Sequence, residues 1–179
     1  MNEQSFELEP FLAEDAVPDI KITGSISRSS NIITVRFIMF GPLTEAVIPG
    51  PSKDPQRRNA LWEETCLEFF LGERGSDLYW EFNLSPAGHW NVYRFDAYRE
   101  GMQEEEAFMS LPFSVSNGPD TLLLDLELDL GNIIAGDMGL DAAVSAVVKL
   151  KDGRETCWSL VHPGPRPDFH HRDGFIIGL

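Results

Sequence analysis

Apolar and polar residues alternate along much of this chain, as they do in strands that bury one face. The clearest segment is TLLLDLELDL, residues 121–130, where every second residue is leucine and three acidic residues lie between them. Residues 20–41 predict two strands around the polar turn SRSSN, and residues 142–162 predict a hairpin that turns at Asp152-Gly153. With a final strand in residues 173–179, we expect about nine to eleven strands.

Helical patterns are scarce in the same sequence. RRNALWEET, residues 57–65, predicts one or two helical turns, and GMQEEEAFM, residues 101–109, predicts a short helix between strands. Many short strands with alternating rather than continuous apolar residues favour an antiparallel β-sandwich over a parallel α/β sheet. We therefore expect an all-β sandwich with one or two short helices. It should be a single domain over residues 1–179, in which the Pro- and Gly-rich residues 40–59 form a rim loop.

The period of two divides the side chains of CLEFFL and YWEFNL between two faces. Six apolar side chains are assigned to the core, namely Leu67, Phe69, Leu71, Trp80, Phe82 and Leu84. The opposite face receives Glu68, Glu81 and Asn83. If these segments are neighbouring antiparallel strands, Glu68 and Glu81 should lie nearly opposite each other, about 5 Å apart.

The strand that follows, HWNVYRFDAY, has a register that the sequence leaves open. It adds one of two alternating sets to the polar face: Asn91 and Tyr93, or Trp90, Val92 and Arg94. Trp62 lies just before the first of these strands, where it can fold over the rim. Carboxylates and amides bond to sugar hydroxyl groups, and indole rings stack on the C–H faces of sugars. The polar face therefore predicts a saccharide site, with an ordinary solvated sheet face as the alternative.

The formal net charge of −15 argues against polyanionic partners, because affinity for nucleic acids depends on Lys and Arg. We therefore expect neither nucleic acid nor an anionic membrane as a partner. The first residues lack the basic and apolar regions of a secretion leader, and no apolar run reaches about 18 residues, so a cytoplasmic protein is expected. Cys66 and Cys157 lie far apart and outside any C-x-x-C pair, which predicts two free thiols.

The usual motifs of hydrolases, nucleotide-binding proteins and zinc proteases are absent from the sequence. The stretch HPGPRPDFHHRD gathers His162, His170 and His171 with Asp168 and Asp173, but its spacing fits no established zinc pattern, and no metal site is predicted. The carboxyl pair on the polar face leaves a retaining glycosidase as a remote alternative, since that chemistry needs carboxyls about 5 to 5.5 Å apart. The prediction is a binding module without catalytic residues.

LWEETCLEFFL, YWEFNLSPAGHWNVY and PDFHHRDGF, in this order, resemble the superfamily that joins type 9 carbohydrate-binding modules with DOMON domains. The likeness is greatest to stand-alone bacterial DOMON-like proteins, and it covers residues 20–179. It implies a β-sandwich that binds either a sugar or haem. In the sugar-binding members, a sugar lies between two tryptophans and is held by charged and amide side chains.

Carried over by position, Trp62 matches the first of those tryptophans, and Glu68 matches the carboxylate that follows it. Glu81 and Asn83 occupy the strand where the family alternates Arg and Asn. Glu81 departs from that pattern, and Arg94 is the candidate to supply the missing charge. The resemblance thus implies ligand contacts from Trp62, Glu68, Glu81, Asn83 and Arg94.

Three features of the resemblance leave alternatives open. Phe175 stands where the second tryptophan is expected. The haem-binding members use Met and His ligands, for which this sequence offers Met39, Met102, Met109, His89 and His170 without fixing a pair. No cofactor is expected, although haem or a structural calcium ion fits the family. A module that docks another protein is the remaining alternative.

Overall fold

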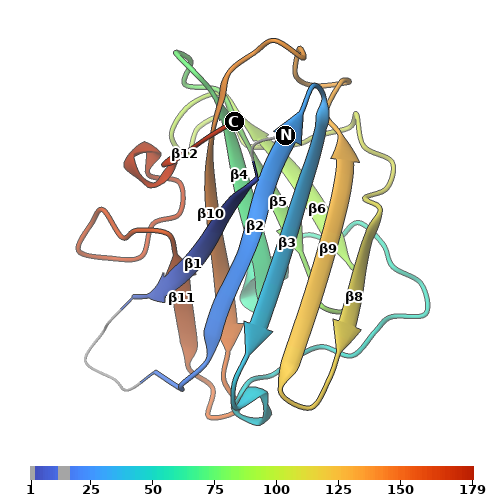
Figure 1. The fold of residues 1–179 in the computed structure, drawn as a ribbon, viewed down its shortest axis with the longest axis vertical. Coiled ribbons are helices and arrows are strands. Elements are labelled where there is room, and N and C mark those ends of the chain that lie inside the picture. Colours follow the sequence, from blue (N-terminus) through green and yellow to red (C-terminus); the bar gives the residue numbers. More distant parts are fainter. Residues whose placement is uncertain (1–2, 12–16) are drawn as a thin grey trace.

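The computed structural model describes residues 3–11 and 17–179, and these residues form an almost purely β structure (Figure 1). The described strands are β1 (Gln4–Pro10), β2 (Lys21–Ser29), β3 (Ile32–Phe40), β4 (Cys66–Glu73), β5 (Tyr79–Leu84), β6 (Trp90–Phe95), β7 (Gln103–Glu104), β8 (Phe113–Asn117), β9 (Thr121–Asp129), β10 (Leu140–Lys149), β11 (Glu155–Ser159) and β12 (Ile177–Gly178). Three short 3-10 turns accompany them: η1 (Leu43–Glu45), η2 (Leu61–Glu63) and η3 (Arg172–Gly174).

The strands form two antiparallel sheets, and the predicted β-sandwich is confirmed. Sheet A has the order β1-β2-β3-β9-β8, and sheet B has the order β7-β6-β5-β4-β10-β11, with β12 also paired to β10. In Figure 1 sheet A lies in front of sheet B. Strand β1 belongs to both sheets, because its first part pairs with β2 while Glu9 and Pro10 pair with β11. The two layers are therefore joined along one side.

Most of the predicted strands lie where the alternation placed them. Residues 20–41 form the β2–β3 hairpin, and residues 121–130 contain β9. The β10–β11 hairpin turns at Asp152-Gly153, where Gly153 has a φ of 92°, a left-handed conformation that glycine adopts without strain. The predicted final strand is reduced to the two residues of β12.

One of the two helical predictions is confirmed as a single turn, and the other is wrong. Residues 57–65 contain only the single 3-10 turn η2. Residues 101–109 contain no helix; Gln103 and Glu104 are extended and pair with Arg94 and Tyr93 of β6. Hydrogen bonds to the free edge of sheet B are available there, and this tertiary pairing outweighs the helical propensity of the Glu-rich segment. No helix among the described residues has the length and apolar character that crossing a membrane requires.

The core lies between the sheets and contains every side chain that the alternation assigned to it. Leu122, Leu124, Leu126, Leu128 and Leu130 bury the inward face of the β9 segment, and the six predicted residues of β4 and β5 do so for sheet B. Phe69 and Phe82, which pair across β4 and β5, stack with their ring centroids 4.3 Å apart. Removal of this apolar area from water is the main term that stabilises the sandwich.

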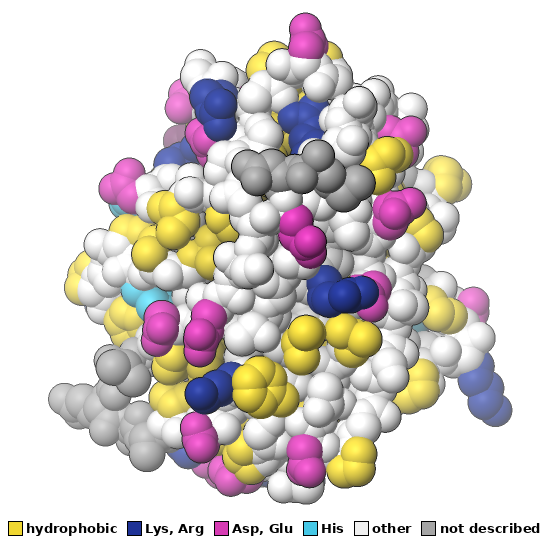
Figure 2. All heavy atoms as spheres, viewed as in Figure 1, with side chains coloured by type: hydrophobic (Ala, Val, Ile, Leu, Met, Phe, Trp, Pro, Cys, Tyr) yellow, Lys and Arg dark blue, Asp and Glu magenta, His cyan; other side chains and the backbone are white. Residues whose placement is uncertain are grey.

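The outer faces of the two sheets differ. On sheet A the outward residues of β3 and β9 are largely exposed, and Figure 2 shows acidic side chains scattered over this side of the molecule. On sheet B the outward residues of β4, β5 and β10 are mostly buried. Loops cover them, and a second apolar cluster forms there from Phe70, Tyr79, Tyr93, Phe95, Ala143 and Phe175. Sheet B is thus packed on both sides, whereas the sheet of the solvated-face alternative would have one side in contact with water.

The rim loop between η1 and η2 is attached to sheet B through Arg57. The Arg57 guanidinium donates to Asn91 Oδ1 at 2.8 Å and to the backbone oxygens of Glu105 and Phe108 at 2.9 and 2.6 Å. It also lies over the indole ring of Trp90, 4.4 Å from the ring centroid. Because the same loop continues into η2, Arg57 fixes the approach of the segment that carries Trp62.

Candidate functional site

A pocket of about 430 Å³ opens on the covered outer face of sheet B. Its lining includes Trp62, Glu68, Glu81, Arg99, Met102 and His170. The two carboxyls come from the central strands β4 and β5, whereas the other four side chains come from η2 and from loops. The floor of the pocket is therefore rigid sheet, and its walls are supplied by connecting segments.

Glu68, Glu81 and Asn83 share the outer face, as the period of two predicts. Their relative register differs from the prediction: Glu68 pairs with Asn83, and Glu81 pairs with Phe70. The two glutamates are therefore diagonal neighbours rather than an opposed pair. Diagonal positions have Cα atoms roughly 7 to 8 Å apart, so the argument from directly opposed carboxyls, on which the glycosidase alternative depended, no longer holds.

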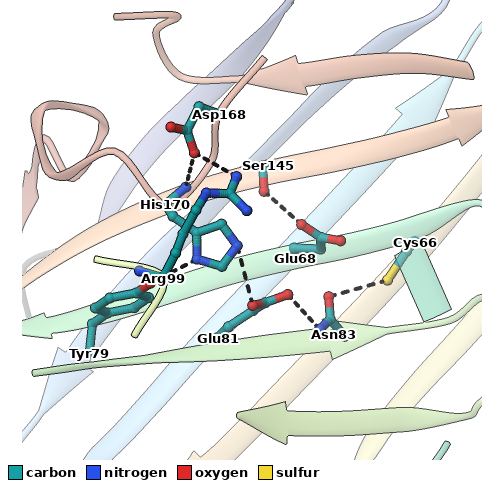
Figure 3. A network of polar contacts seen from close by, with 9 residues as sticks. All are labelled: Cys66, Glu68, Tyr79, Glu81, Asn83, Arg99, Ser145, Asp168 and His170. Carbon is teal, nitrogen blue, oxygen red and sulfur yellow. Dashed lines mark hydrogen bonds and ion pairs between the residues drawn. The ribbon is translucent and has the colours of Figure 1, made fainter. Parts of the chain in front are cut away.

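Hydrogen bonds hold the floor residues in two separate sets (Figure 3). Asn83 Nδ2 donates to Glu81 Oε1 at 2.8 Å, and the Cys66 thiol lies 3.7 Å from Asn83 Oδ1. Ser145 Oγ on β10 donates to Glu68 Oε2 at 3.3 Å. Glu68, Glu81 and Asn83 are 2%, 5% and 0% exposed. The three predicted side chains are thus held in place by neutral partners within the sheet.

Burial changes the protonation of both carboxyls. It raises the pKa of Glu68 well above the usual value, and the charge of Glu81 raises it further. Burial also raises the pKa of Glu81 from 4.5 to about 7, against the opposing effects of its Asn83 hydrogen bond and of Arg99. At neutral pH the Glu68 and Glu81 carboxyls are therefore partly protonated, and they can both donate and accept hydrogen bonds.

His170 faces Glu81 across the pocket, with 3.7 Å between Nε2 and Glu81 Oε2. Its other nitrogen, Nδ1, lies 2.8 Å from the hydroxyl of buried Tyr79. That hydroxyl also accepts a bond from the Arg99 backbone N–H, and a tyrosine proton donated to Nδ1 would leave the imidazole proton on Nε2. Burial, with a further effect of Arg99, lowers the pKa of His170 to about 4. The ring is therefore neutral at pH 7, and its Nε2 faces Glu81.

The arginine at the pocket is Arg99 rather than Arg94. Arg94 lies on the other face of β6, opposite Trp80 in register, and pairs with Asp96 at 3.1 Å. Arg99 lines the pocket from the turn after β6, in a left-handed conformation with a φ of 54°. Its guanidinium contacts Asp168 at 2.8 Å. The structure thus brings Arg99 to the site and leaves Arg94 outside it.

Trp62 stands at the mouth of the pocket on η2. Its ring meets Tyr93 edge to face, with 5.7 Å between centroids, and the side chain is still 37% exposed. Tyr93 and Asn91 form the outward side of β6, which settles the register that the sequence left open. Asn91 is fully buried and bonded to Arg57, so it belongs to the support of the rim loop.

The other residues that the sequence singled out are dispersed. Phe175 is 7% exposed and packs on Phe70 and Tyr79, so it offers no free ring at the pocket. His162 contacts the backbone of Glu9, and the side chain of His171 accepts a bond from the Asp173 backbone. Among the described residues, no three His, Cys, Asp or Glu side chains are placed to hold a metal ion.

The haem candidates separate into those at the pocket and those elsewhere. Met102 and His170 line the pocket. Met39 is fully buried in the core, Met109 is 91% exposed, and His89 accepts a bond from the Gln56 backbone at the β5–β6 turn.

Cys66 and Cys157 are free thiols, as predicted. Burial raises the pKa of Cys157 to about 11, so this pocket thiol stays protonated at neutral pH.

Arg99 and His170 are two of the pocket residues that the sequence analysis did not assign to the saccharide site. His170 was considered there only as a metal or haem ligand, and Arg99 was not considered at all. Both lie in loops, where no hydrophobic period fixes the direction of a side chain. The one available signal was the local density of polar and aromatic residues in AYREGM and PDFHHRD.

Comparisons with known proteins bear on the fold. No protein-family model matches the sequence, and a search of the curated proteins finds no match. Among solved structures, a candidate carbohydrate-binding protein of Bacteroides uniformis matches with a TM-score of 0.70 and 18% identity, over 97% of this chain and 84% of that one.

A family 9 carbohydrate-binding module of Caldicellulosiruptor kristjanssonii matches in two complexes, one with glucose and one with cellotriose. Both matches have a TM-score of 0.51 and 11% identity over 84% of this chain, and they cover 71% and 70% of the module. The chain therefore has the β-sandwich fold of these carbohydrate-binding modules.

Proposed function

We propose that this chain is a non-catalytic saccharide-binding module whose ligand occupies the pocket on sheet B. The observation that carries the proposal is the buried outer face itself. Glu68, Glu81 and Asn83 are gathered there beneath an exposed indole, although each polar side chain costs free energy to bury. A concave site with a few convergent polar groups and an aromatic wall is the usual form of a small-ligand site.

Each pocket residue has a role that follows from its chemistry. Trp62 stacks on the C–H face of a sugar ring. Glu68 and Glu81 exchange hydrogen bonds with its hydroxyl groups, and Nε2 of His170 adds one more. Asn83 does not line the pocket; it holds Glu81 in place through its side-chain amide. Arg99 supplies the charged contact that the sequence analysis expected from Arg94. The likeness of the fold to modules solved with glucose and cellotriose supports the same ligand class.

The test is a calorimetric titration of the protein with glucose, galactose, cellobiose and their amino derivatives, repeated with Trp62→Ala. A saturable signal is expected for at least one sugar, and loss of the stacking ring should weaken it roughly tenfold, equivalent to about 1.4 kcal/mol. Phe40→Ala is the matched control, because Phe40 on sheet A is 38% exposed against 37% for Trp62 and lies outside the pocket. Equal affinities in both variants would contradict the proposed site.

Haem is the second candidate, because Met102 and His170 line the same pocket. The fit is poorer than that of a sugar. Nδ1 of His170 is bonded to Tyr79, and its free Nε2 lies 3.7 Å from the Glu81 carboxyl, so an iron on that nitrogen would lie against the carboxyl. Protein produced with haem available should be colourless. A visible absorbance band that His170→Ala removes would favour haem instead.

A further inference from the structure

The floor of the pocket contains two carboxyls that have no cation of their own. The salt bridges among the described residues give neither Glu68 nor Glu81 a lysine or arginine partner. Their hydrogen-bond donors are the neutral hydroxyl of Ser145 and the neutral amide of Asn83. Buried carboxylates are normally paired with a cation, and without one these two carboxyls ionise only at a cost in free energy.

Among the described residues, no nearby lysine or arginine forms an ion pair with either carboxyl, although the charge of Arg99 lowers the pKa of Glu81 slightly against burial. Arg99, at the wall, is bound to Asp168 at 2.8 Å, and the third pocket carboxylate, Glu155, is bound to Lys149 at 2.6 Å. His170 is neutral at pH 7, because burial lowers its pKa to about 4. Arg99 and Glu155 thus have ion-pair partners, whereas Glu68 and Glu81 have no lysine or arginine partner among the described residues.

A primary ammonium group on the ligand matches this arrangement. It provides one positive charge and three N–H donors, which suit two diagonal carboxyls and one further acceptor. We propose that the saccharide bound by this pocket carries a protonated amine, which lies between Glu68 and Glu81. The inference rests on the proposed function and narrows its ligand to amino sugars.

Binding of such a ligand is coupled to proton release. The empty floor retains protons because burial raises the pKa of both glutamates, and an ammonium group beside them favours their ionised forms. The other titratable groups beside the two carboxyls keep their protonation states at neutral pH. Burial raises the pKa values of the Cys66 and Cys157 thiols and of the Tyr79 and Tyr93 hydroxyls, which stay protonated, and His170 is already neutral. The protons released therefore come from the two carboxyls.

The experiment is calorimetry at pH 6.5 with two matched trios: glucosamine, N-acetylglucosamine and glucose, and the corresponding galactose series. At this pH a primary amine is protonated, and acetylation removes its charge with little change to the ring. We expect one amino sugar to bind at least tenfold more tightly than both of its neutral counterparts. In buffers of different ionisation enthalpy, it should release a fraction of a proton that the neutral sugars do not.

Substitutions of the two floor glutamates test whether these carboxyls cause the preference for an amine. Glu81→Gln and Glu68→Gln keep the shape of each side chain without a charge, and either one should reduce the amine preference to less than threefold. Glu127→Gln, at an exposed position of β9 on sheet A, removes one charge of the same type far from the pocket and should leave the preference intact. Circular dichroism of each variant shows that it is folded.

The outcomes separate the two proposals. If neutral sugars bind as tightly as the amino sugars, the proposal that the ligand carries an amine is wrong, and the proposal of a saccharide-binding module is unaffected. Cyclohexylamine binding as tightly as glucosamine would overturn the saccharide part of the inference. The absence of binding by every sugar, amino or neutral, would overturn the inference and the proposed function together.

Discussion

At the scale of single residues, the two floor glutamates reduce the stability of the protein that contains them. Glu81 has a pKa of about 7 in the folded protein against 4.5 for the free side chain. Between these values the folded state binds more protons than the unfolded state, so the contribution of Glu81 to stability falls as the pH rises from 4.5 to 7. His170 acts in the opposite direction, since its lowered pKa makes stability fall as the pH drops from 6.5 to 4.

The change Glu81→Gln removes the pH dependence of stability that comes from the Glu81 carboxyl. The free energy of unfolding of the variant, minus that of the parent, should therefore increase between pH 4.5 and pH 7.5, by on the order of 2 to 3 kcal/mol. Urea unfolding at four or five pH values measures this difference. The same difference for Glu127→Gln, which is exposed on β9, should stay nearly constant. A constant difference for Glu81→Gln as well would mean that the carboxyl is not desolvated.

The sequence predicted the face of each floor residue and missed their register. Alternation places Glu68, Glu81 and Asn83 outward whatever the pairing, because side-chain direction depends only on position along the strand. The pairing of Glu68 with Asn83 depends on the loop between β4 and β5, whose conformation the alternation does not specify. Arg99 was missed for a related reason, since its left-handed turn is not encoded by a period.

At the scale of elements, the rim loop depends on one arginine. Arg57 makes three hydrogen bonds and stacks over Trp90, a geometry that needs the planar fork of a guanidinium. Arg57→Lys should therefore lower the free energy of unfolding by about 1 to 3 kcal/mol, because a lysine leaves some of these acceptors unpaired. Its neighbour Arg58 is exposed, so Arg58→Lys should change stability by less than about 0.5 kcal/mol.

Denaturant unfolding of the two lysine variants provides the measurement. Equal stabilities would show that the Arg57 contacts are not formed in solution.

Elements were predicted well where burial has a period, as in β9, and poorly where pairing is a tertiary effect. Strand β7 is the example: Gln103 and Glu104 favour a helix in isolation, and only the free edge of β6 makes them extended.

At the scale of the whole molecule, the two sheets share one core and one strand. Leu8 of β1 is buried in that core, while its strand is hydrogen-bonded to both β2 and β11. The sequence predicted the sandwich but not the strand order, because alternation reports burial and contains no information on which strand is the neighbour of which. The single domain expected over residues 1–179 remains a prediction that unfolding tests.

All four tryptophans of the chain lie in sheet B or against it, namely Trp62, Trp80, Trp90 and Trp158. Tryptophan fluorescence therefore follows sheet B, whereas far-ultraviolet circular dichroism follows both sheets. We expect the two urea transitions to coincide, as they do when a domain unfolds in one cooperative step. Midpoints that differ clearly, with sheet A persisting after the fluorescence change, would indicate two units that unfold separately.

The double burial of sheet B has a kinetic consequence for its pocket. Backbone amides of β4 and β5 are covered by the core on one side and by loops on the other, so their hydrogen exchange requires opening of the whole sandwich. Local fluctuations are left to the segments around Trp62, Arg99 and His170. A ligand therefore meets a floor that already has its final shape, and any adjustment that accompanies its binding is confined to the side chains of those loops.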